Sequence, residues 1–478
     1  MKIKRDFDVV ISEIAGYASS RGDFSDEARE VAALSLIDAI GCAVLATSVP
    51  RAMSLVDPSY LGATQSGKIP VMGTNLRLDA VRSAFANGTL IRWLDYNDTF
   101  LALEWGHPSD NLGAILATAH WRHSGGGPRG VLRLTVGDII SAAIRAHEIQ
   151  GVLSMSCSLN ARGIDHVAYV RIASAALACA LLGGEEDEIA ASVSQAFVDG
   201  ATLRCYRHAP NAGSRKSWAS GEATSRGVQL AALTLAGVEG YPSAVTAANW
   251  GFQEGFLGGD PLRLAQPLGS YVMEKVLLKV PYPAEFHAQS ALEAAVFLHG
   301  QVAGRLDEIE EIRISTHRSA MRIIAKDGPL SNPADRDHSL QYIVALGLIK
   351  GEVSYLDYED QVAGDPRIDV LRKKMSVVED GRFSRDYLDP ALRSVANSLE
   401  VIFLDGTSVT RTVEYPLGHP RRRGEAKGAI LEKFYANVAS GIGSARADAA
   451  MEATSDLSRF LEMDVTGLFS LFVRPDDI

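Results

Sequence analysis

The sequence has few cysteines and no long apolar run free of charges. Its four cysteines, Cys42, Cys157, Cys179 and Cys205, are far apart and form no C-x-x-C pair. This spacing gives no sign of a disulfide framework or of a zinc or iron–sulfur cage. No window of 18 residues is both apolar and uncharged, so we expect no membrane span. These absences are typical of a soluble protein in a reducing cytosol.

The N-terminus also lacks the features of a targeting segment. It is amphipathic and carries Asp6, Asp8 and Glu13, whereas a secretory peptide needs an unbroken apolar stretch and a transit peptide is poor in acids. We therefore expect a cytoplasmic protein.

The sequence has fewer basic than acidic residues. The 478 residues include 47 lysines and arginines against 58 aspartates and glutamates, which gives a formal net charge of −11. This balance argues against a nucleic-acid-binding protein, and an anionic substrate would need a local basic pocket. Apolar residues make up 47% and charged residues 22%, the ordinary balance of a globular chain. The length is typical of two or three domains.

The first 270 residues or so are rich in Ala, Leu, Ile and Gly, and their patterns are typical of helices. Ser25 is a plausible N-cap for a buried helix over 28–45, and Thr135 with Asp138 matches a capping box. The stretches 169–183 and 222–237 repeat the Ala-rich pattern, and small residues let helices approach closely. We predict a large all-α helical domain over 1–275.

The pattern changes near Met273. Residues 276–280 and 312–316 alternate with period two, which predicts strands. Two further alternating runs flank Asp405-Gly406, a strong hairpin signal. Helical spacing returns from Ala426. The predicted fold is therefore mainly α, with an inserted smaller α+β domain over 276–418 and C-terminal helices over 419–478 that complete the first domain.

The segment from Trp93 to Asn111 holds the densest group of polar side chains. If 80–103 is helical, Asp95 and Thr99 lie one turn apart on one face. Gly106 and Pro108 break the helix and fix His107 in a turn, after which Ser109 or Asp110 can cap the next helix. From composition alone, helix caps and a structural turn histidine are favoured over a reactive site in this segment.

Longer runs resemble the MmgE/PrpD family. They are LDYNDTFLALEWGHPSDNLGAILATA, NWGFQEGFLGGDPLRLAQPLGSYVMEKVLLKVPYPAEFHAQSALEAA, DHSLQYIVALGLIKGEVSYLDYEDQVAGDPRIDVLRKKM and YPLGHPRRR. The resemblance covers about residues 30 to 440. It implies a helical domain with an inserted α+β lid, a homodimer, and catalysis without a metal or other cofactor. The implied reaction is the dehydration of 2-methylcitrate to 2-methyl-cis-aconitate in propionate catabolism, with some activity on citrate.

The resemblance also assigns site residues. The family's Asp-x-x-x-Thr motif falls on Asp95 and Thr99, and the histidine after it on His107. Its second histidine falls on His166 of RGIDHVAY, a shorter segment than the family usually has. The remaining matches are Lys216 of RKSWASGEA, Lys279 of LKVPYPAEFH with His287 downstream, and Tyr342 of HSLQY.

The reaction gives each residue a chemical role. Loss of water beside a carboxylate needs fixed cations, a general base and a general acid. Lys216 and Lys279 suit the carboxylates, and Lys279 would face away from the apolar side of its strand. His107, oriented by Asp95, and His166 are the acid–base pair, and which is acid and which is base stays open.

The other assignments concern substrate binding. Thr99 and His287 would contact the substrate, and Tyr342 would donate to its hydroxyl or a carboxylate, unless Tyr342 is a buried structural residue. Arg204 and Arg207 belong to a basic loop suited to a trianion. We expect His147 to be a core histidine. The run 421–423 is a surface charge cluster or a contact with substrate or partner subunit.

Several other functions stay open. The same family includes decarboxylases of cis-aconitate and epimerases of small dicarboxylates. A non-catalytic tricarboxylate-binding protein and a metal-dependent enzyme are further alternatives. The full set of matched residues favours the dehydratase over the binding protein.

Overall fold

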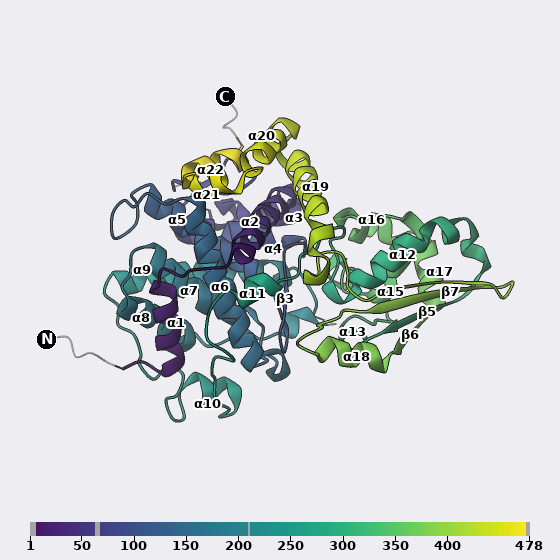
Figure 1. Cartoon of the computed structure of the whole chain (residues 1–478), viewed down its shortest axis with the longest axis horizontal. Coiled ribbons are helices and arrows are strands. Elements are labelled where there is room, and N and C mark those ends of the chain that lie inside the picture. Colours follow the sequence, from purple (N-terminus) through teal and green to yellow (C-terminus); the bar gives the residue numbers. More distant parts are fainter. Residues whose placement is uncertain (1–5, 63–66, 209–210, 475–478) are drawn as a thin grey trace. The chain divides into compact units, whose positions relative to one another are not determined.

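The computed structural model describes residues 6–62, 67–208 and 211–474, which divide into two units (Figure 1). Unit 1 comprises Met1–Cys205, Arg215–Val276 and Ile430–Ile478, and unit 2 comprises Tyr206–Ser214 and Leu277–Ala429. The C-terminal end of unit 2, at Ala429, lies within a continuous helix, α19 (Arg423–Ile442), rather than at residue 418 as the sequence suggested.

Unit 1 is built almost entirely from helices. Two short antiparallel hairpins, which the sequence patterns did not reveal, interrupt them: β1 (Ile69–Pro70) with β2 (Arg77–Leu78), and β3 (Phe100–Leu101) with β4 (Trp105–Gly106). Its helices besides the end of α19 are α1 (Val9–Ser19), α2 (Asp26–Ala46), α3 (Pro50–Val56), α4 (Ala80–Trp93), α5 (Leu112–His123), α6 (Val136–Ser156), α7 (Val167–Leu181), α8 (Glu186–Val198), α9 (Arg215–Leu235), α10 (Phe252–Leu257), α11 (Tyr271–Lys275), α20 (Ser444–Thr454), α21 (Leu457–Glu462) and α22 (Val465–Phe472).

The predicted helix starts are confirmed. The Ser25 side chain accepts a hydrogen bond from the Ala28 amide at 3.0 Å and begins α2. Thr135 and Asp138 form a capping box at the start of α6. In both cases a side chain satisfies an amide that the helix itself leaves unpaired.

Glycines let α4 pack closely against α5 and α9. A Cβ atom on Gly221 would lie 2.2 Å from Thr89 Oγ1 and 2.5 Å from the Phe85 carbonyl oxygen. A Cβ on Gly113 would lie 2.8 Å from the Gly88 Cα. Since real Cβ atoms do not come so near to backbone, only glycine fits at these crossings. The crossings fix the C-terminal end of α4, from which the candidate site begins.

Unit 2 combines helices with a four-stranded sheet in the order β6-β5-β7-β8. Strand β5 pairs in parallel with β6 and antiparallel with β7, and β7 pairs antiparallel with β8. The strands are β5 (Ile309–Thr316), β6 (Met375–Glu379), β7 (Asn397–Phe403) and β8 (Ser408–Val413), and the helices are α12 (Gln289–Val302), α13 (Arg318–Ile323), α14 (Pro333–Arg336), α15 (Leu340–Lys350), α16 (Asp360–Ala363), α17 (Pro366–Lys373), α18 (Gly381–Leu388) and the start of α19.

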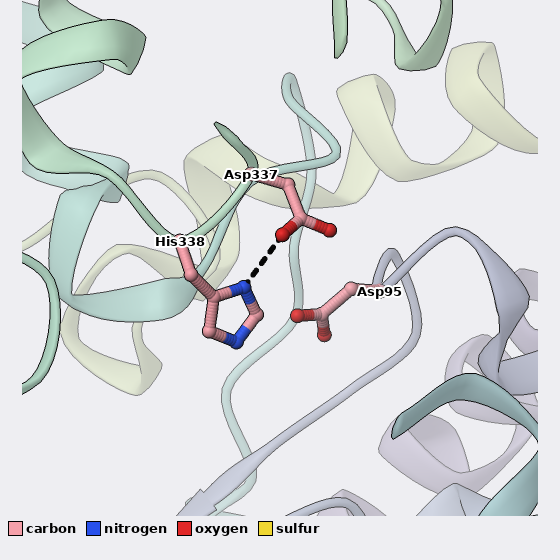
Figure 2. A group of neighbouring side chains, drawn as sticks. All are labelled: Asp95, Asp337 and His338. Carbon is pink, nitrogen blue, oxygen red and sulfur yellow. Dashed lines mark hydrogen bonds and ion pairs between the residues drawn. The ribbon is translucent and has the colours of Figure 1, made fainter. Parts of the chain in front are cut away.

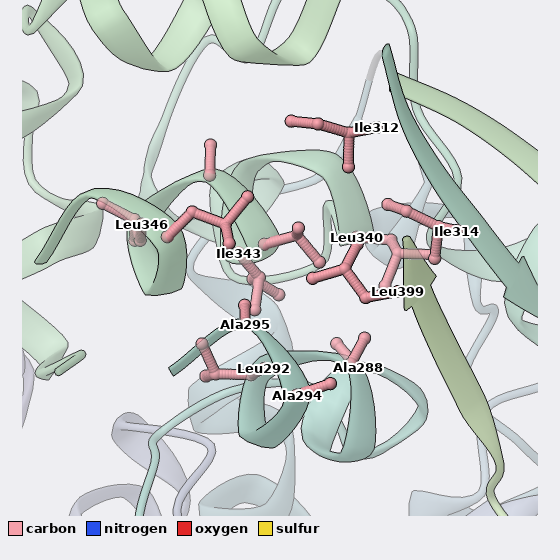
Figure 3. Packing of buried hydrophobic residues seen from close by; sticks show 14 of the residues in the cluster. Ala288, Leu292, Ala294, Ala295, Ile312, Ile314, Leu340, Ile343, Leu346 and Leu399 are labelled. Carbon is pink, nitrogen blue, oxygen red and sulfur yellow. The ribbon is translucent and has the colours of Figure 1, made fainter. Parts of the chain in front are cut away.

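The core of unit 2 lies between α12, α15 and one face of the sheet. Figure 3 shows Leu292 of α12, Ile343 of α15, Ile314 of β5 and Leu399 of β7 packing together. Buried and partly exposed residues alternate along β7, as period two requires. The strand over 312–316 and the hairpin around Asp405-Gly406 are both confirmed, with Gly406 at φ 82° in the turn.

Two predictions near the candidate site are wrong. The helix expected over 80–103 ends at Trp93, because Asp95 takes a left-handed conformation with φ 49° and residues 100–106 pair as a hairpin. Asp95 and Thr99 therefore do not share a helical face. Residues 276–280 belong to none of the sheets, and all five are buried, including Lys279. Alternation cannot assign a side to a residue in a segment that is buried throughout.

No single helix of residues 6–62, 67–208 and 211–474 is both long and apolar enough to cross a membrane. Helices α2 and α3 reach that length and composition only together, and they meet at a bend of 101°.

The glycine crossing is tested by Gly221→Val. The new side chain would collide with α4 backbone, so we expect the free energy of unfolding to fall by roughly 3 kcal/mol or more. The control is Gly428→Ala at an exposed position of α19, where nothing lies within 4 Å of the new Cβ. That change should be neutral or stabilise by about 0.5–1 kcal/mol. Urea denaturation compares the two, and equal stability of both variants would contradict the close crossing.

Candidate active site

The loop after α4 begins with a strained residue. Asp95 is 3% exposed and has φ 49°, a conformation that costs a non-glycine residue roughly 1–2 kcal/mol. Such a turn persists only where neighbouring groups hold it. The chain then enters the hairpin β3–β4, and Pro108–Asn111 forms a single 3₁₀ turn before α5. Neither Ser109 nor Asp110 caps α5, whose start at Leu112 has no side-chain cap.

Arg92 in the last turn of α4 connects the acidic and the imidazole side chains. Its guanidinium pairs with the Asp95 carboxylate, and Nη2 lies 2.8 Å from Nε2 of His107. Its Nε is 3.9 Å from Asp110 Oδ1. Sequence reasoning missed Arg92, because an arginine near a helix C-terminus is common. Arg92 is 3% exposed, so its charge acts in a region nearly free of water.

The contacts of His107 define its tautomer. Nδ1 lies 2.8 Å from the Asp98 carbonyl oxygen, which can only accept a hydrogen bond. Nε2 faces Arg92, whose guanidinium can only donate. His107 therefore carries its proton on Nδ1 and accepts at Nε2, as a neutral imidazole. The lone pair at Nε2 makes this residue a proton acceptor.

Asp98 is the hub of the buried network. Its Oδ2 accepts from Ser35 Oγ and from His147 Nε2, each at 2.8 Å, and Oδ1 accepts from the Ser109 amide at 3.0 Å. Burial by itself raises the pKa of Asp98, but the charge and hydrogen bond of His147 and the bonds from Ser109 hold it below its usual value. Three groups thus orient the Asp98 carboxylate, and its main-chain carbonyl separately binds His107.

His147 has a larger role than sequence reasoning gave it. It is buried, as expected of a core histidine, but Nδ1 lies 2.8 Å from the Ala143 carbonyl oxygen and Nε2 faces Asp98. Since both nitrogens face acceptors, the ring donates twice and pairs with Asp98 as an imidazolium. The pair supports the backbone that binds His107.

Thr99 is used within the hairpin. Its hydroxyl donates to the Gly106 carbonyl at 2.9 Å, and the residue is fully buried. This bond closes the hairpin directly before His107. The structure thus gives Thr99 a structural contact, and its predicted contact with substrate stays a prediction.

His166 lies in the same unit, close to His107. The two ring centroids are 5.6 Å apart. Asp165 stands beside His166, with Oδ1 at 3.2 Å from Nδ1, and its other oxygen is 3.6 Å from Arg204 Nη1. The structure therefore brings together four of the predicted residues, Asp95, His107, His166 and Arg204, around partners that the sequence did not single out.

Glu104 in the turn of the hairpin is one of these unpredicted groups. Its Oε2 accepts from the Asn160 amide at 2.6 Å and from Ser158 Oγ at 3.1 Å. Burial raises the pKa of Glu104 to about 7, although these two bonds and the charge of Arg204 oppose the rise. A buried carboxyl group that titrates near neutral pH is a common feature of active sites.

Lys216 is placed by the crossing of α9 with α4. It is the second residue of α9 and is 7% exposed. The next residue, Ser217, donates to the Trp93 carbonyl at 3.2 Å, at the end of α4. Lys216 therefore begins its helix beside the point where the Asp95 turn starts.

The predicted basic loop is divided between the two units. Arg204 belongs to unit 1, while Arg207 belongs to unit 2, where it lies over the Tyr206 ring with 5.4 Å to the centroid. Arg215 stacks on Trp218 at 4.3 Å. Each unit thus carries its own basic residues.

A second group of charged side chains lies in unit 2. Lys279 is 1% exposed, and Glu285 accepts from Nδ1 of His287 at 2.6 Å. Burial alone would raise the pKa of Glu285, but the charge and hydrogen bond of His287, with the charges of His338 and Lys279, hold it below its usual value. Figure 2 shows His338 paired with Asp337, Nδ1 to Oδ1 at 2.7 Å.

His287 and Tyr342 are both engaged inside unit 2. His287 contacts Glu285 through one nitrogen, and its Nε2 lies 3.1 Å from the Tyr387 hydroxyl. The Tyr342 hydroxyl donates to the Asp357 carbonyl at 2.8 Å, and burial raises its pKa to about 12. The geometry of Tyr342 is that of a structural tyrosine in the core. Roles of either residue toward substrate stay predictions.

Arg421 and Arg422 also have partners within unit 2. Arg421 lies over the Tyr415 ring, and Arg422 binds Glu293 at 2.7 Å and Glu425 at 3.0 Å. These contacts are those of a surface charge cluster.

Unit 1 holds buried acid–base groups, and unit 2 holds the buried Lys279, which are side chains of the kinds that acid–base catalysis uses. The MmgE/PrpD N-terminal domain matches residues 12–265, and the MmgE/PrpD C-terminal domain matches residues 282–457. The chain belongs to the MmgE/PrpD family.

The relatives are similar over more than nine tenths of their lengths. The 2-methylcitrate dehydratase of Cupriavidus necator is 48% identical over 471 residues, 98% of this chain and 97% of the relative. That of Escherichia coli (strain K12) is 45% identical over 475 residues, 98% of both chains. The mitochondrial 2-methylcitrate dehydratase of Yarrowia lipolytica is 45% identical over 475 residues, 98% of this chain and 91% of the relative. The chain is accordingly an enzyme of the hydro-lyase class.

Glu104 makes stability depend on pH. Its pKa is about 7 in the folded state against 4.5 for an ordinary glutamate, so the folded protein holds this proton more tightly. The resulting stabilisation is complete below about pH 4.5 and is lost as the pH rises through 7; its size is on the order of 3 kcal/mol. Glu104→Gln should therefore gain in melting temperature relative to wild type between pH 5 and pH 8.

The control is Glu432→Gln, at an exposed glutamate of α19. It should follow wild type at both pH values in differential scanning calorimetry. A constant difference between Glu104→Gln and wild type from pH 5 to pH 8 would contradict the assignment.

Proposed function

We propose that this enzyme dehydrates 2-methylcitrate to 2-methyl-cis-aconitate, with a weaker reaction on citrate, in propionate catabolism. The observation that carries the proposal is end-to-end similarity, at 45–48% identity, to relatives named 2-methylcitrate dehydratase. The chemistry of the buried His107 cluster supports it.

The reaction removes a proton from a carbon beside a carboxylate and hydroxide from the neighbouring carbon. The extra charge develops on a carboxylate that is already anionic, so the enzyme must supply fixed cations, a base and an acid. We propose that side chains supply all of these without a metal or other cofactor.

We assign the base to His107. A neutral imidazole with its proton on Nδ1 can accept a proton only at Nε2, and that lone pair now accepts from Arg92. The substrate must therefore replace the Arg92 contact before proton transfer. A carboxylate of the substrate is a suitable new partner for the guanidinium.

We assign the acid to His166. The Asp165 carboxylate at 3.2 Å from Nδ1 provides the surroundings in which a proton-donating imidazolium is stabilised. Protonation of the leaving hydroxyl by His166 would regenerate a neutral ring that Asp165 keeps oriented. Lys216, Lys279 and Arg204 are proposed to stabilise the carboxylates.

The two substrates differ by one methyl group. In an apolar pocket, a methyl group changes the free energy of the transition state by only about 1–3 kcal/mol. A measurable reaction with citrate, slower by roughly 10–200-fold, is therefore expected. The homodimer, the lid role of unit 2 and the cytoplasmic location stay predictions.

The test follows the absorbance of the conjugated acid after chelator-treated enzyme is mixed with 2-methylcitrate, and separately with citrate. A rise that is faster with 2-methylcitrate is the expected result. If neither acid reacts and cis-aconitate releases carbon dioxide, the enzyme is a decarboxylase. Activity that the chelator abolishes would contradict the metal-free mechanism, and stoichiometric binding without turnover would contradict catalysis.

Replacement of the proposed base should remove catalysis and leave the fold. His107→Gln keeps a polar side chain of similar length but cannot take up the proton, so kcat should fall by about 10²–10⁴-fold. His299→Gln, at a histidine of α12 bound to the Leu348 carbonyl, is the matched control and should keep near-wild-type kcat. Steady-state kinetics with circular dichroism compares them. Turnover of His107→Gln close to wild type would rule out the assigned role.

The unit 2 cation is tested by Lys279→Met and Lys279→Arg. Loss of the charge should lower kcat/KM by roughly 100-fold, whereas arginine keeps the charge and should recover part of that loss. Lys427→Met, at an exposed lysine of α19, is the control. Equal kcat/KM for Lys279→Met and the control, in correctly folded protein, would show that Lys279 has no part in the reaction.

A further inference from the structure

Lys433 on α19 is a buried cation with three contacts in unit 1. Its side chain is 3% exposed, and that of Asp38 on α2 is 1% exposed. Nζ lies 2.7 Å from Asp38 Oδ1, donates to the Tyr96 carbonyl at 2.7 Å, and is 3.6 Å from the centroid of the Tyr96 ring. One ammonium group therefore binds both a core helix and the residue directly after the strained Asp95.

Helix packing places the ammonium there. A Cβ on Gly41 of α2 would lie 3.1 Å from Phe434 Cδ2, and a Cβ on Gly441 of α19 would lie 2.6 Å from the Val44 carbonyl oxygen. The two helices are thus in close contact at these two positions. Asp38 lies one turn before Gly41 on α2, and Lys433 lies directly before Phe434 on α19. The contact between Gly41 and Phe434 therefore brings Asp38 and Lys433 close to each other.

The pKa of Asp38 depends on the charges of Lys433 and Asp98. Asp38 and Asp98 are both buried carboxylates, and each raises the cost of the other's charge. Burial raises the pKa of Asp38 to about 6, while the charge and hydrogen bond of Lys433 lower it and Asp98 raises it. Lys433 therefore carries the positive charge that lets Asp38 ionise.

Stability alone does not account for such a pair. Apolar side chains of similar size usually stabilise a protein core as well as a buried ion pair does. What an apolar side chain cannot do is donate to a main-chain carbonyl. The Tyr96 carbonyl lies where the left-handed turn at Asp95 leads into Asp98, whose own carbonyl binds His107.

We propose that Lys433 is a positioning residue for the acid–base site. By holding the Tyr96 carbonyl, it fixes the turn at Asp95 and thereby the contact between Arg92 and His107. Asp38 in turn fixes the direction of the ammonium. The role rests on the proposed dehydration, and Lys433 acts through the loop rather than on a reacting atom.

Three variants separate positioning from stability. Lys433→Met leaves Asp38 buried without its cation and should lower the melting temperature by roughly 5–10 °C. The double variant Asp38→Asn with Lys433→Met has no unpaired charge and should recover most of that loss. Asp38→Asn alone completes the double-mutant cycle.

Turnover should not recover together with stability. The double variant still lacks the donor to Tyr96, so its kcat should stay lower than wild type by at least about tenfold, with KM changed less, because small misplacements of catalytic groups reduce turnover strongly. Lys427→Met on the same helix should match wild type in every measurement. A double variant with wild-type kcat would overturn the proposal, since Lys433 would then be only half of an ion pair.

Hydrogen exchange gives a reading that does not require dehydratase activity. Amides of residues 94–99 should lose protection in the double variant, while α2 and α4 keep theirs. Unchanged protection over 94–99 would overturn the proposal even if the enzyme has a different substrate. Absence of turnover in wild type would instead contradict the proposed function and leave this comparison to decide about Lys433.

Discussion

The buried Asp98 carboxylate is the constraint on which the site in unit 1 depends. A buried charge without a partner would cost several kcal/mol, so Asp98 must keep Ser35, His147 and the Ser109 amide in place. Those three partners fix the backbone on both sides of the hairpin, and the Asp98 carbonyl then sets the tautomer of His107. The nitrogen that we propose as the base is thus defined by a network of buried groups around His107.

Local signals in the sequence predicted much of the fold. Ser25, the Thr135–Asp138 box and Asp405-Gly406 were visible because each acts on residues at most a few positions away. The helices and the later strands could likewise be predicted, because each produces a periodic pattern of apolar residues within a short stretch of sequence. The short hairpins of unit 1 were missed because a two-residue strand has no period to detect.

The site could be predicted only in part. The family resemblance gave His107 and Asp95, but not Arg92 or Asp98, which position them. Asp98 is 63 residues from Ser35 and 49 from His147, so no short pattern marks the network. The end of α4 was misplaced for the same reason, because tertiary contacts stabilise the left-handed turn at Asp95. Lys279 is a further case. Alternation predicts that it faces away from the apolar side of a strand, whereas the whole segment around it is buried.

The protonation state of His107 tests this account most directly. Nitrogen-15 NMR of histidine-labelled enzyme, with the His107 signals identified by their loss in His107→Gln, distinguishes the two neutral tautomers and the imidazolium. We predict a neutral ring near pH 7.5 with the proton on Nδ1 and a hydrogen-bonded, unprotonated Nε2. A proton on Nε2, in either the other tautomer or the imidazolium, would contradict the assignment of His107 as an acceptor held by Arg92 and Asp98.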